Sequence, residues 1–110
     1  MESIELKTLC QYIPRLRDTI KHNVKSLLEN DQLVRSGLIT RENYDMLKVS
    51  RESPDTQATT LLEHVINKVS RDKSKYHTFV NILRKEHIYH DIVRRLDRKY
   101  SINKLQGDYA

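Results

Sequence analysis

The stretch DTQATTLLEHVINKV, residues 55–69, decides the fold class of this 110-residue chain. Its apolar side chains recur at steps of three and four, the spacing that gathers them on one face of an α-helix. These positions are Ala58, Leu61, Leu62, Val65, Ile66 and Val69. Ser53 and Pro54 come directly before, and serine as the capping residue with proline at the first helical position is typical of a helix start. The sequence therefore predicts an amphipathic helix that buries one face in a core.

The same periodicity extends from this helix in both directions along the chain. Residues 3–25 form a stripe that Pro14 interrupts, and because proline removes a hydrogen bond inside a helix, we expect a kink or a restart there. Gly37 ends the next apolar segment, and Thr40 is expected to cap the helix that follows it. Two later stripes consist of Tyr76, Phe79, Val80 and Leu83, and of Ile88, Ile92, Val93 and Leu96. These segments predict an all-α fold, a six-helix antiparallel bundle with a kinked first helix.

Length and composition are consistent with a single domain. A chain of 110 residues can bury one core, and 37% hydrophobic residues with 32% charged residues allow that core to lie under a charged surface. We assign residues 1–97 to the helical bundle. After Asp97 the periodicity is lost, so residues 98–110 are expected to form a basic, flexible tail.

The composition also excludes several kinds of protein. Cys10 is the single cysteine, which excludes an intrachain disulfide and a cysteine-based zinc site. Its place on the first apolar stripe predicts a buried thiol. No apolar run approaches the ~20 residues of a membrane span, and the acidic N-terminal stretch does not have the pattern of a signal peptide. We therefore expect a cytoplasmic protein with no membrane partner.

No residue pattern typical of catalysis or cofactor binding is found in the sequence. The serines, histidines and aspartates follow no triad order, and two glycines in the whole chain argue against a phosphate-cradling loop. His87 and His90 lie beside Asp91, but no metal-binding motif surrounds them, so they are expected to be surface histidines. We expect no enzyme activity, no cofactor and no bound metal.

The net charge of +5 is concentrated in the last third of the chain. Residues 1–70 contain ten basic and ten acidic side chains, whereas residues 71–104 contain ten basic and four acidic ones. A positive end attracts nucleic acid, acidic lipid or an acidic protein surface, although a solvated basic face needs no partner at all. The doublets Arg84-Lys85, Arg94-Arg95 and Arg98-Lys99 make a small nucleic-acid-binding domain the alternative function. Nucleic acid is nevertheless not the expected partner, because no helix-turn-helix pattern accompanies them.

Four patterns occur in a fixed order along the chain. The first is the interrupted opening helix, with apolar positions between Ile13 and Val24, and the second is the turn SGLIT of residues 36–40. The third is P-x-x-x-A-x-x-L-L over residues 54–62, and the fourth is Y-x-x-F-x-x-x-L over residues 76–83. In this order the patterns resemble the caspase recruitment domain (CARD), a member of the death-fold superfamily, over about residues 10–97.

The resemblance implies a binding module with six helices in a Greek-key-like arrangement. CARDs associate with one another and can propagate filaments, which bring caspases, adaptors or sensors together in apoptotic, innate-immune or inflammatory signalling. For this chain it implies self-association, CARD-containing partners and no reaction of its own. One departure concerns the second helix, whose usual apolar pair falls on Glu29 and Asn30, and it leaves the boundary between helices 1 and 2 open.

The family's type I contact pairs a basic surface of helices 1 and 4 with an acidic surface of helices 2 and 3. By resemblance, the basic residues are Arg17, Lys21 and Lys25, spaced by four, and the acidic residues are Asp31, Glu42 and Asp45. Helix 4 departs from the pattern, because Asp55 stands where strongly basic members have arginine. Arg51 and Arg71, in the loops before and after helix 4, match the family's other two contact types. Ordinary solvated helix faces would also account for these charges.

Overall fold

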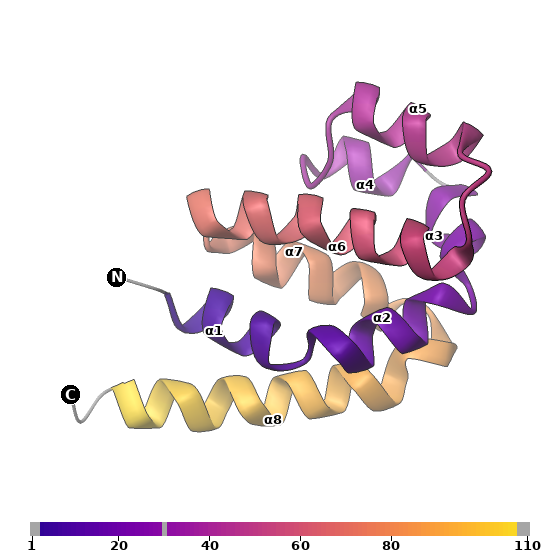
Figure 1. The fold of residues 1–110 in the computed structure, drawn as a ribbon. Helices are drawn as coiled ribbons and strands as arrows, with labels where there is room; N and C mark the ends of the chain where they lie inside the picture. Colours follow the sequence, from indigo (N-terminus) through magenta and orange to yellow (C-terminus); the bar gives the residue numbers. More distant parts are fainter. Residues whose placement is uncertain (1–2, 30, 108–110) are drawn as a thin grey trace.

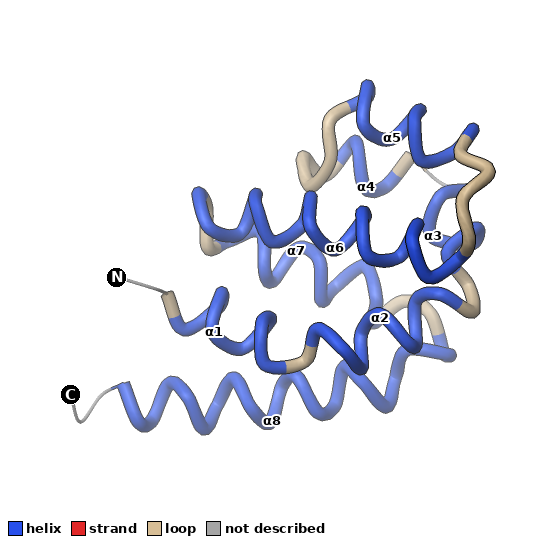
Figure 2. The backbone as a smooth tube through the Cα atoms, viewed as in Figure 1, coloured by secondary structure: helices blue, strands red, loops and turns tan. Residues whose placement is uncertain are grey.

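A computed structural model describes residues 3–29 and 31–107, and the regular structure of these residues is entirely helical (Figures 1 and 2). The elements in chain order are α1 (Ile4–Gln11), α2 (Ile13–Lys21), α3 (Val24–Glu29), α4 (Gln32–Arg35), α5 (Arg41–Val49), α6 (Pro54–Arg71), α7 (Ser74–Arg84), the 3₁₀ turn η1 (His87–Tyr89) and α8 (His90–Gly107). The prediction of an all-α bundle is confirmed. The described residues form eight α-helices rather than six, because Tyr12 separates α1 from α2 and the turn at Asp31 comes before α4.

Side-chain caps set the starts of three helices. Ser3 accepts a hydrogen bond from the backbone N–H three residues on, at 3.1 Å, where α1 begins. Thr40 caps α5 in the same way at 3.1 Å, and Ser53 caps α6 at 3.3 Å. Each cap satisfies a first-turn amide that has no partner within its own helix. The predicted caps Thr40 and Ser53 are thus confirmed.

The opening helix is broken at Tyr12, whose φ of −113° and ψ of 11° are not helical. α2 restarts at Ile13 with Pro14 in its first turn, where a missing N–H costs no intrahelical hydrogen bond. This confirms the restart predicted at Pro14. The break allows α2 to pack along α6 while α1 packs along α8 (Figure 1).

Gly37 ends the α4 segment in a left-handed conformation, with a φ of +80°. A side chain at this position would be strained, and its Cβ would lie 3.0 Å from Lys75 Nζ. Lys75 reaches this turn from α7 and donates a hydrogen bond to the Ser36 carbonyl oxygen at 2.8 Å. The role predicted for Gly37 is confirmed, and the turn is also tied to α7.

α6 lies in the middle of the bundle, with α1, α2, α3 and α7 packed around it. Its buried apolar residues are Ala58, Leu61, Leu62, Val65 and Val69, and Ile66 is partly buried against them. This is the predicted face of the helix. Every α-helix of the described residues contributes at least one buried apolar residue to the same hydrophobic cluster.

The expected flexible tail after Asp97 is wrong for residues 98–107, which continue α8 as a regular helix. Asn103 is buried and donates hydrogen bonds to Thr8 Oγ1 at 2.8 Å and to Gln11 Oε1 at 3.1 Å. The face that this part of α8 turns to α1 is therefore polar, which is why it gives no apolar period in the sequence. Residues 108–110 of the expected tail lie outside the described residues.

Two expectations for single side chains are also corrected. Cys10 is exposed rather than buried, because the face of α1 that points inward consists of Glu5, Thr8 and Leu9. Ile88, placed on the last apolar stripe, is 52% exposed, because it belongs to the 3₁₀ turn η1 rather than to α8. The shift from one helix type to another breaks the period of 3.6 residues.

Candidate functional site

The three predicted basic residues do not share one helix. Arg17 and Lys21 lie on α2, but α2 ends at Lys21 and Lys25 belongs to α3. The three remain neighbours, since Arg17 and Lys21 line one surface depression and Lys21 and Lys25 line the next. We call these three residues the basic surface.

Two acidic residues beside the basic surface partly neutralise its charge. Lys21 Nζ lies 3.6 Å from a carboxylate oxygen of Asp18 and 3.5 Å from one of Asp55. Asp55 is in the first turn of α6, where the helix dipole favours a negative charge. Asp55 therefore weakens the positive charge of this surface in two ways. It stands where the sequence resemblance would place an arginine, and its carboxylate also pairs with Lys21.

The three predicted acidic residues lie around α4 and α5. Asp31 is half-buried directly before α4, and Glu42 and Asp45 are exposed on α5. We call these three residues the acidic surface. In Figure 1 α6 lies between α5, which carries Glu42 and Asp45, and α2, which carries Arg17 and Lys21. Lys25 lies on α3, which packs against α4 and α5.

Arg41, which sequence reasoning missed, joins two members of the acidic surface. Its guanidinium donates hydrogen bonds to the two carboxylate oxygens of Asp31 at 3.5 and 3.3 Å, and it lies 4.0 Å from Asp45. The hydrogen bond from Arg41 lowers the pKa of Asp31 below its ordinary value. The spacing of four between Arg41 and Asp45 was the signal available in the sequence, whereas the turn that brings Asp31 to Arg41 gave none.

Tyr44 fixes the helix on which the acidic surface lies. Its ring is buried, and its hydroxyl donates a hydrogen bond to the carbonyl oxygen of Leu28 at the end of α3. Arg41 and Lys48 approach the ring, at 5.6 and 5.4 Å from its centroid. Burial raises the pKa of Tyr44, so it stays a neutral donor. α5 is thereby held against α3, and Glu42 and Asp45 keep a fixed outward position.

Arg51 and Arg71 join neither of these surfaces. Arg51 is exposed in the loop before α6, as expected, whereas Arg71 is the last residue of α6 rather than part of a loop. Arg51 comes before α6 and Arg71 ends it, and the 18 residues of this helix correspond to a length of about 27 Å at 1.5 Å per residue.

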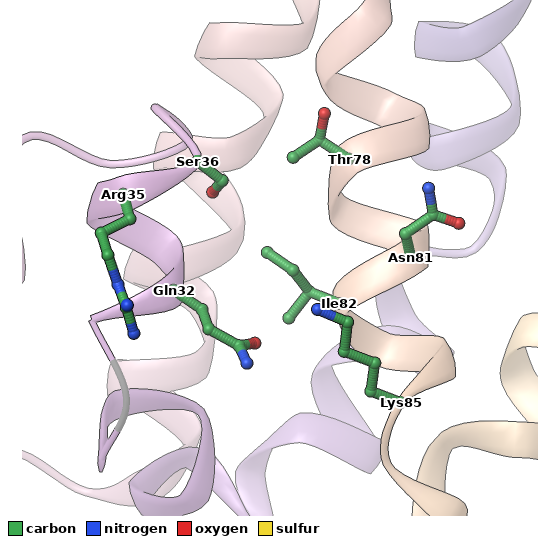
Figure 3. Close-up of a pocket in the computed structure, with 7 residues that line it drawn as sticks. All are labelled: Gln32, Arg35, Ser36, Thr78, Asn81, Ile82 and Lys85. Atoms are coloured by element: carbon green, nitrogen blue, oxygen red, sulfur yellow. The ribbon is translucent and has the colours of Figure 1, made fainter.

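The depression between α4 and α7 is shown in Figure 3 and has a volume of about 470 Å³. Gln32, Arg35 and Ser36 form one wall, Thr78 lies across from them on α7, and Ile82 projects into the space between the walls. Lys85 closes one end of the depression. Apart from Ile82, the residues that line the depression are polar or basic.

The histidine pair also lacks the partners that a metal site needs. The rings of His87 and His90 lie 4.8 Å apart edge to face, and Asp91 is paired with Arg95 at 3.2 Å. Over residues 3–29 and 31–107, no group of three or more histidine, cysteine, aspartate or glutamate side chains is placed to hold a metal ion. Among the described helices, none combines the length and the apolar character that crossing a membrane requires.

Part of the basic charge on α7 and α8 is paired within the molecule. Arg84 makes a two-pronged contact with Asp97 at 2.9 and 3.2 Å, which raises the pKa of the arginine. Arg95 is held by Asp91. The doublets that suggested phosphate binding therefore present fewer available charges than the sequence count implies.

Comparison of the chain with protein-family models, with curated proteins and with solved structures gave no match. The surfaces described above are consequently the basis on which a function is inferred. They consist of a basic group of side chains on α2 and α3 and an acidic group at α4 and α5 of one helical bundle.

Proposed function

We propose that this chain is a homotypic protein-interaction module of the CARD type, which clusters signalling partners and performs no reaction of its own. The observation that carries the proposal is the separation by α6 of the basic residues on α2 from the acidic residues on α5. Surfaces of opposite sign on separate sides of one molecule suit head-to-tail stacking of copies, and such a contact propagates because it leaves one surface free at each end.

The arrangement of the helices also supports the proposal. α1 and α2 are separated by a single residue, Tyr12, and α3 ends at Glu29 shortly before α4 begins at Gln32. Counting each divided pair as one helix gives six, the number that the resemblance implies. Helices distant in the sequence pack together, such as α1 with α8 and α2 with α6, as expected for a Greek-key-like bundle.

The proposed partners are other CARD-containing proteins, which include caspases, adaptors and sensors, and further copies of this chain. The proposed setting is apoptotic, innate-immune or inflammatory signalling in the cytoplasm. In such assemblies the module supplies a surface, and proximity activates the attached proteins.

The test compares two charge reversals on the same helix. Arg17→Glu changes the basic surface, whereas Arg15→Glu makes the same change in net charge at an exposed neighbour outside it. Size-exclusion chromatography with light scattering should show self-association of the wild type that Arg17→Glu weakens about tenfold and Arg15→Glu leaves nearly unchanged. Equal effects of both reversals, or a strictly monomeric wild type that binds no other CARD, would count against the proposal.

Nucleic-acid binding is the alternative, and the exposed side chains of Arg94 and Arg98 on α8 favour it. Phosphate contacts need positive charge and reach, and they weaken steeply with salt. Fluorescence anisotropy with a random duplex at low salt tests this alternative, with Arg94→Ala as the variant that should reduce the salt slope. Absence of binding at low salt removes it.

A further inference from the structure

Five large apolar side chains are exposed among the described residues, and four of them lie in two short stripes. On α5, Met46 is 63% exposed and Val49 77%; on α8, Ile102 is 40% exposed and Leu105 61%. The fifth, Ile88, belongs to neither helix. Exposed apolar side chains that gather in this way typically mark an interaction site.

The two stripes have the same pattern. The α5 stripe is Glu42, Met46 and Val49, and the α8 stripe is Arg98, Ile102 and Leu105. Each has a charged residue at position i and apolar residues at i+4 and i+7, which lie on one face of a helix and span about 10 Å along it.

Both stripes face away from the core. On α5 the buried side chains are Tyr44 and Leu47, which lie on the opposite side of the helix from the stripe. On α8 the inward face carries Leu96 and Asn103, again opposite the stripe. Both stripes are therefore free to meet another surface.

The charges that begin the stripes have opposite signs. Over residues 3–29 and 31–107, neither Glu42 nor Arg98 belongs to an ion pair within the molecule. Parallel packing of the two stripes sets Glu42 beside Arg98, Met46 beside Ile102 and Val49 beside Leu105. Antiparallel packing would instead set Glu42 against Leu105, so charge complementarity selects the parallel arrangement.

We propose that the α8 stripe of one copy packs in parallel along the α5 stripe of a second copy of this chain. A depression of about 480 Å³ beside α5 receives the incoming side chains; it is lined by Met46, Leu47 and Val49 of α5 and by His64 of α6, among others. The contact buries four exposed apolar side chains against one another and pairs two opposite charges at one end.

The contact is heterologous, because the two stripes lie on different sides of the molecule. In Figure 1 α5 and α8 are separated by α6 and α2, so one copy cannot satisfy both of its own stripes. A dimer still offers one unused α5 stripe and one unused α8 stripe, one on each copy, and further copies can add. The inference goes beyond the proposed function, since it assigns a second pair of surfaces that shares only Glu42 with the charged pair.

The test uses two variants that each remove one stripe, both made in an Arg17→Glu background that disables the charged contact proposed above. Val49→Asp disables the α5 stripe and Leu105→Asp the α8 stripe. In sedimentation velocity the Arg17→Glu parent should self-associate, and each variant alone should associate about tenfold more weakly. A mixture of the two should form dimers and nothing larger, because each variant retains the stripe that the other lacks.

Ile88→Asp in the same background is the matched control, since it places the same charge at an exposed apolar side chain outside both stripes, and it should associate like the parent. Circular dichroism verifies that all variants remain helical. A monomeric parent in the millimolar range, a single variant that associates like the parent, or a mixture that stays monomeric overturns the inference. None of these results bears on the effect of Arg17→Glu itself, so the proposed function is judged separately.

Discussion

α6 and the second half of α8 are both packed against the rest of the bundle, but through different kinds of contact. α6 buries an apolar face that includes Leu61 and Leu62, each at most 1% exposed. Residues 98–107 of α8 are held through Asn103, which hydrogen-bonds to α1, and through Tyr100, whose ring stacks on Tyr76 at a centroid distance of 5.5 Å. A helix can therefore belong to the fold without an apolar stripe, provided that its polar side chains find partners.

The largest effect on stability is expected at the buried apolar face of α6. Leu61→Ala removes a fully buried side chain from the middle of α6 and leaves a cavity that the helices around it cannot fill. We expect the free energy of unfolding to fall by about 2–5 kcal/mol, as measured by urea denaturation followed by circular dichroism. A loss below about 1 kcal/mol would mean that α6 is not the centre of the core.

The second-largest effect on stability is expected for the polar contacts between α8 and α1. Asn103→Ala removes the donor to Thr8 and Gln11, and it leaves the buried Thr8 hydroxyl without this partner, whereas Gln11 is exposed. The expected destabilisation is about 1–3 kcal/mol in the same assay. Ser101→Ala, at an exposed position two residues away on α8, is the matched control and should change stability very little. Equal effects of the two variants would show that the Asn103 contacts do not hold α8.

Substitutions of Tyr100 distinguish the contribution of ring stacking from that of hydrogen bonding in the second half of α8. Its hydroxyl donates to Glu5 Oε1 at 3.5 Å, a long contact, whereas its ring packs on Tyr76 and lies 5.2 Å from the His77 ring. Tyr100→Phe should therefore cost about 0.5 kcal/mol or less, and Tyr100→Ala about 1 kcal/mol or more. The reverse order would make the hydroxyl, rather than the ring, the contact that matters.

The smallest effect on stability is expected at a third region, the ion pair between Arg41 and Asp31. Because Arg41 lowers the pKa of Asp31 below the ordinary 3.8, ionised Asp31 stabilises the folded state above its unfolded pKa. That stabilisation is lost as the pH falls through the folded pKa. In a carbon-detected NMR titration Arg41→Ala should move the pKa of Asp31 up toward its ordinary value, whereas Lys48→Ala should move it less. An unchanged pKa in Arg41→Ala would refute the pairing.

The parts of the fold that local rules govern could be predicted from the sequence. Pro14 marked the restart of the opening helix, Thr40 and Ser53 marked two helix starts, and Gly37 marked a helix end, because capping and backbone preferences act within a few residues. The helix around Leu61 was predicted because its buried face is apolar except at Gln57.

What could not be predicted depends on contacts between distant residues. The second half of α8 was taken for a tail because Asn103 is buried only through its partners on α1, more than ninety residues away in the chain. The counter-charges at the candidate surfaces were missed for the same reason: Asp55 reaches Lys21 and Arg41 reaches Asp31 only after the chain has folded. A charge pattern read along one helix does not reveal which charges are already paired.

The central claim, that this chain associates with its own kind through charged surfaces, is tested most directly by light scattering of the wild type over a wide range of concentrations at low and high salt. The account predicts an average mass that rises with concentration, and a rise that becomes smaller as salt screens the opposite charges. A mass that stays at that of the single chain at every concentration and salt would contradict it.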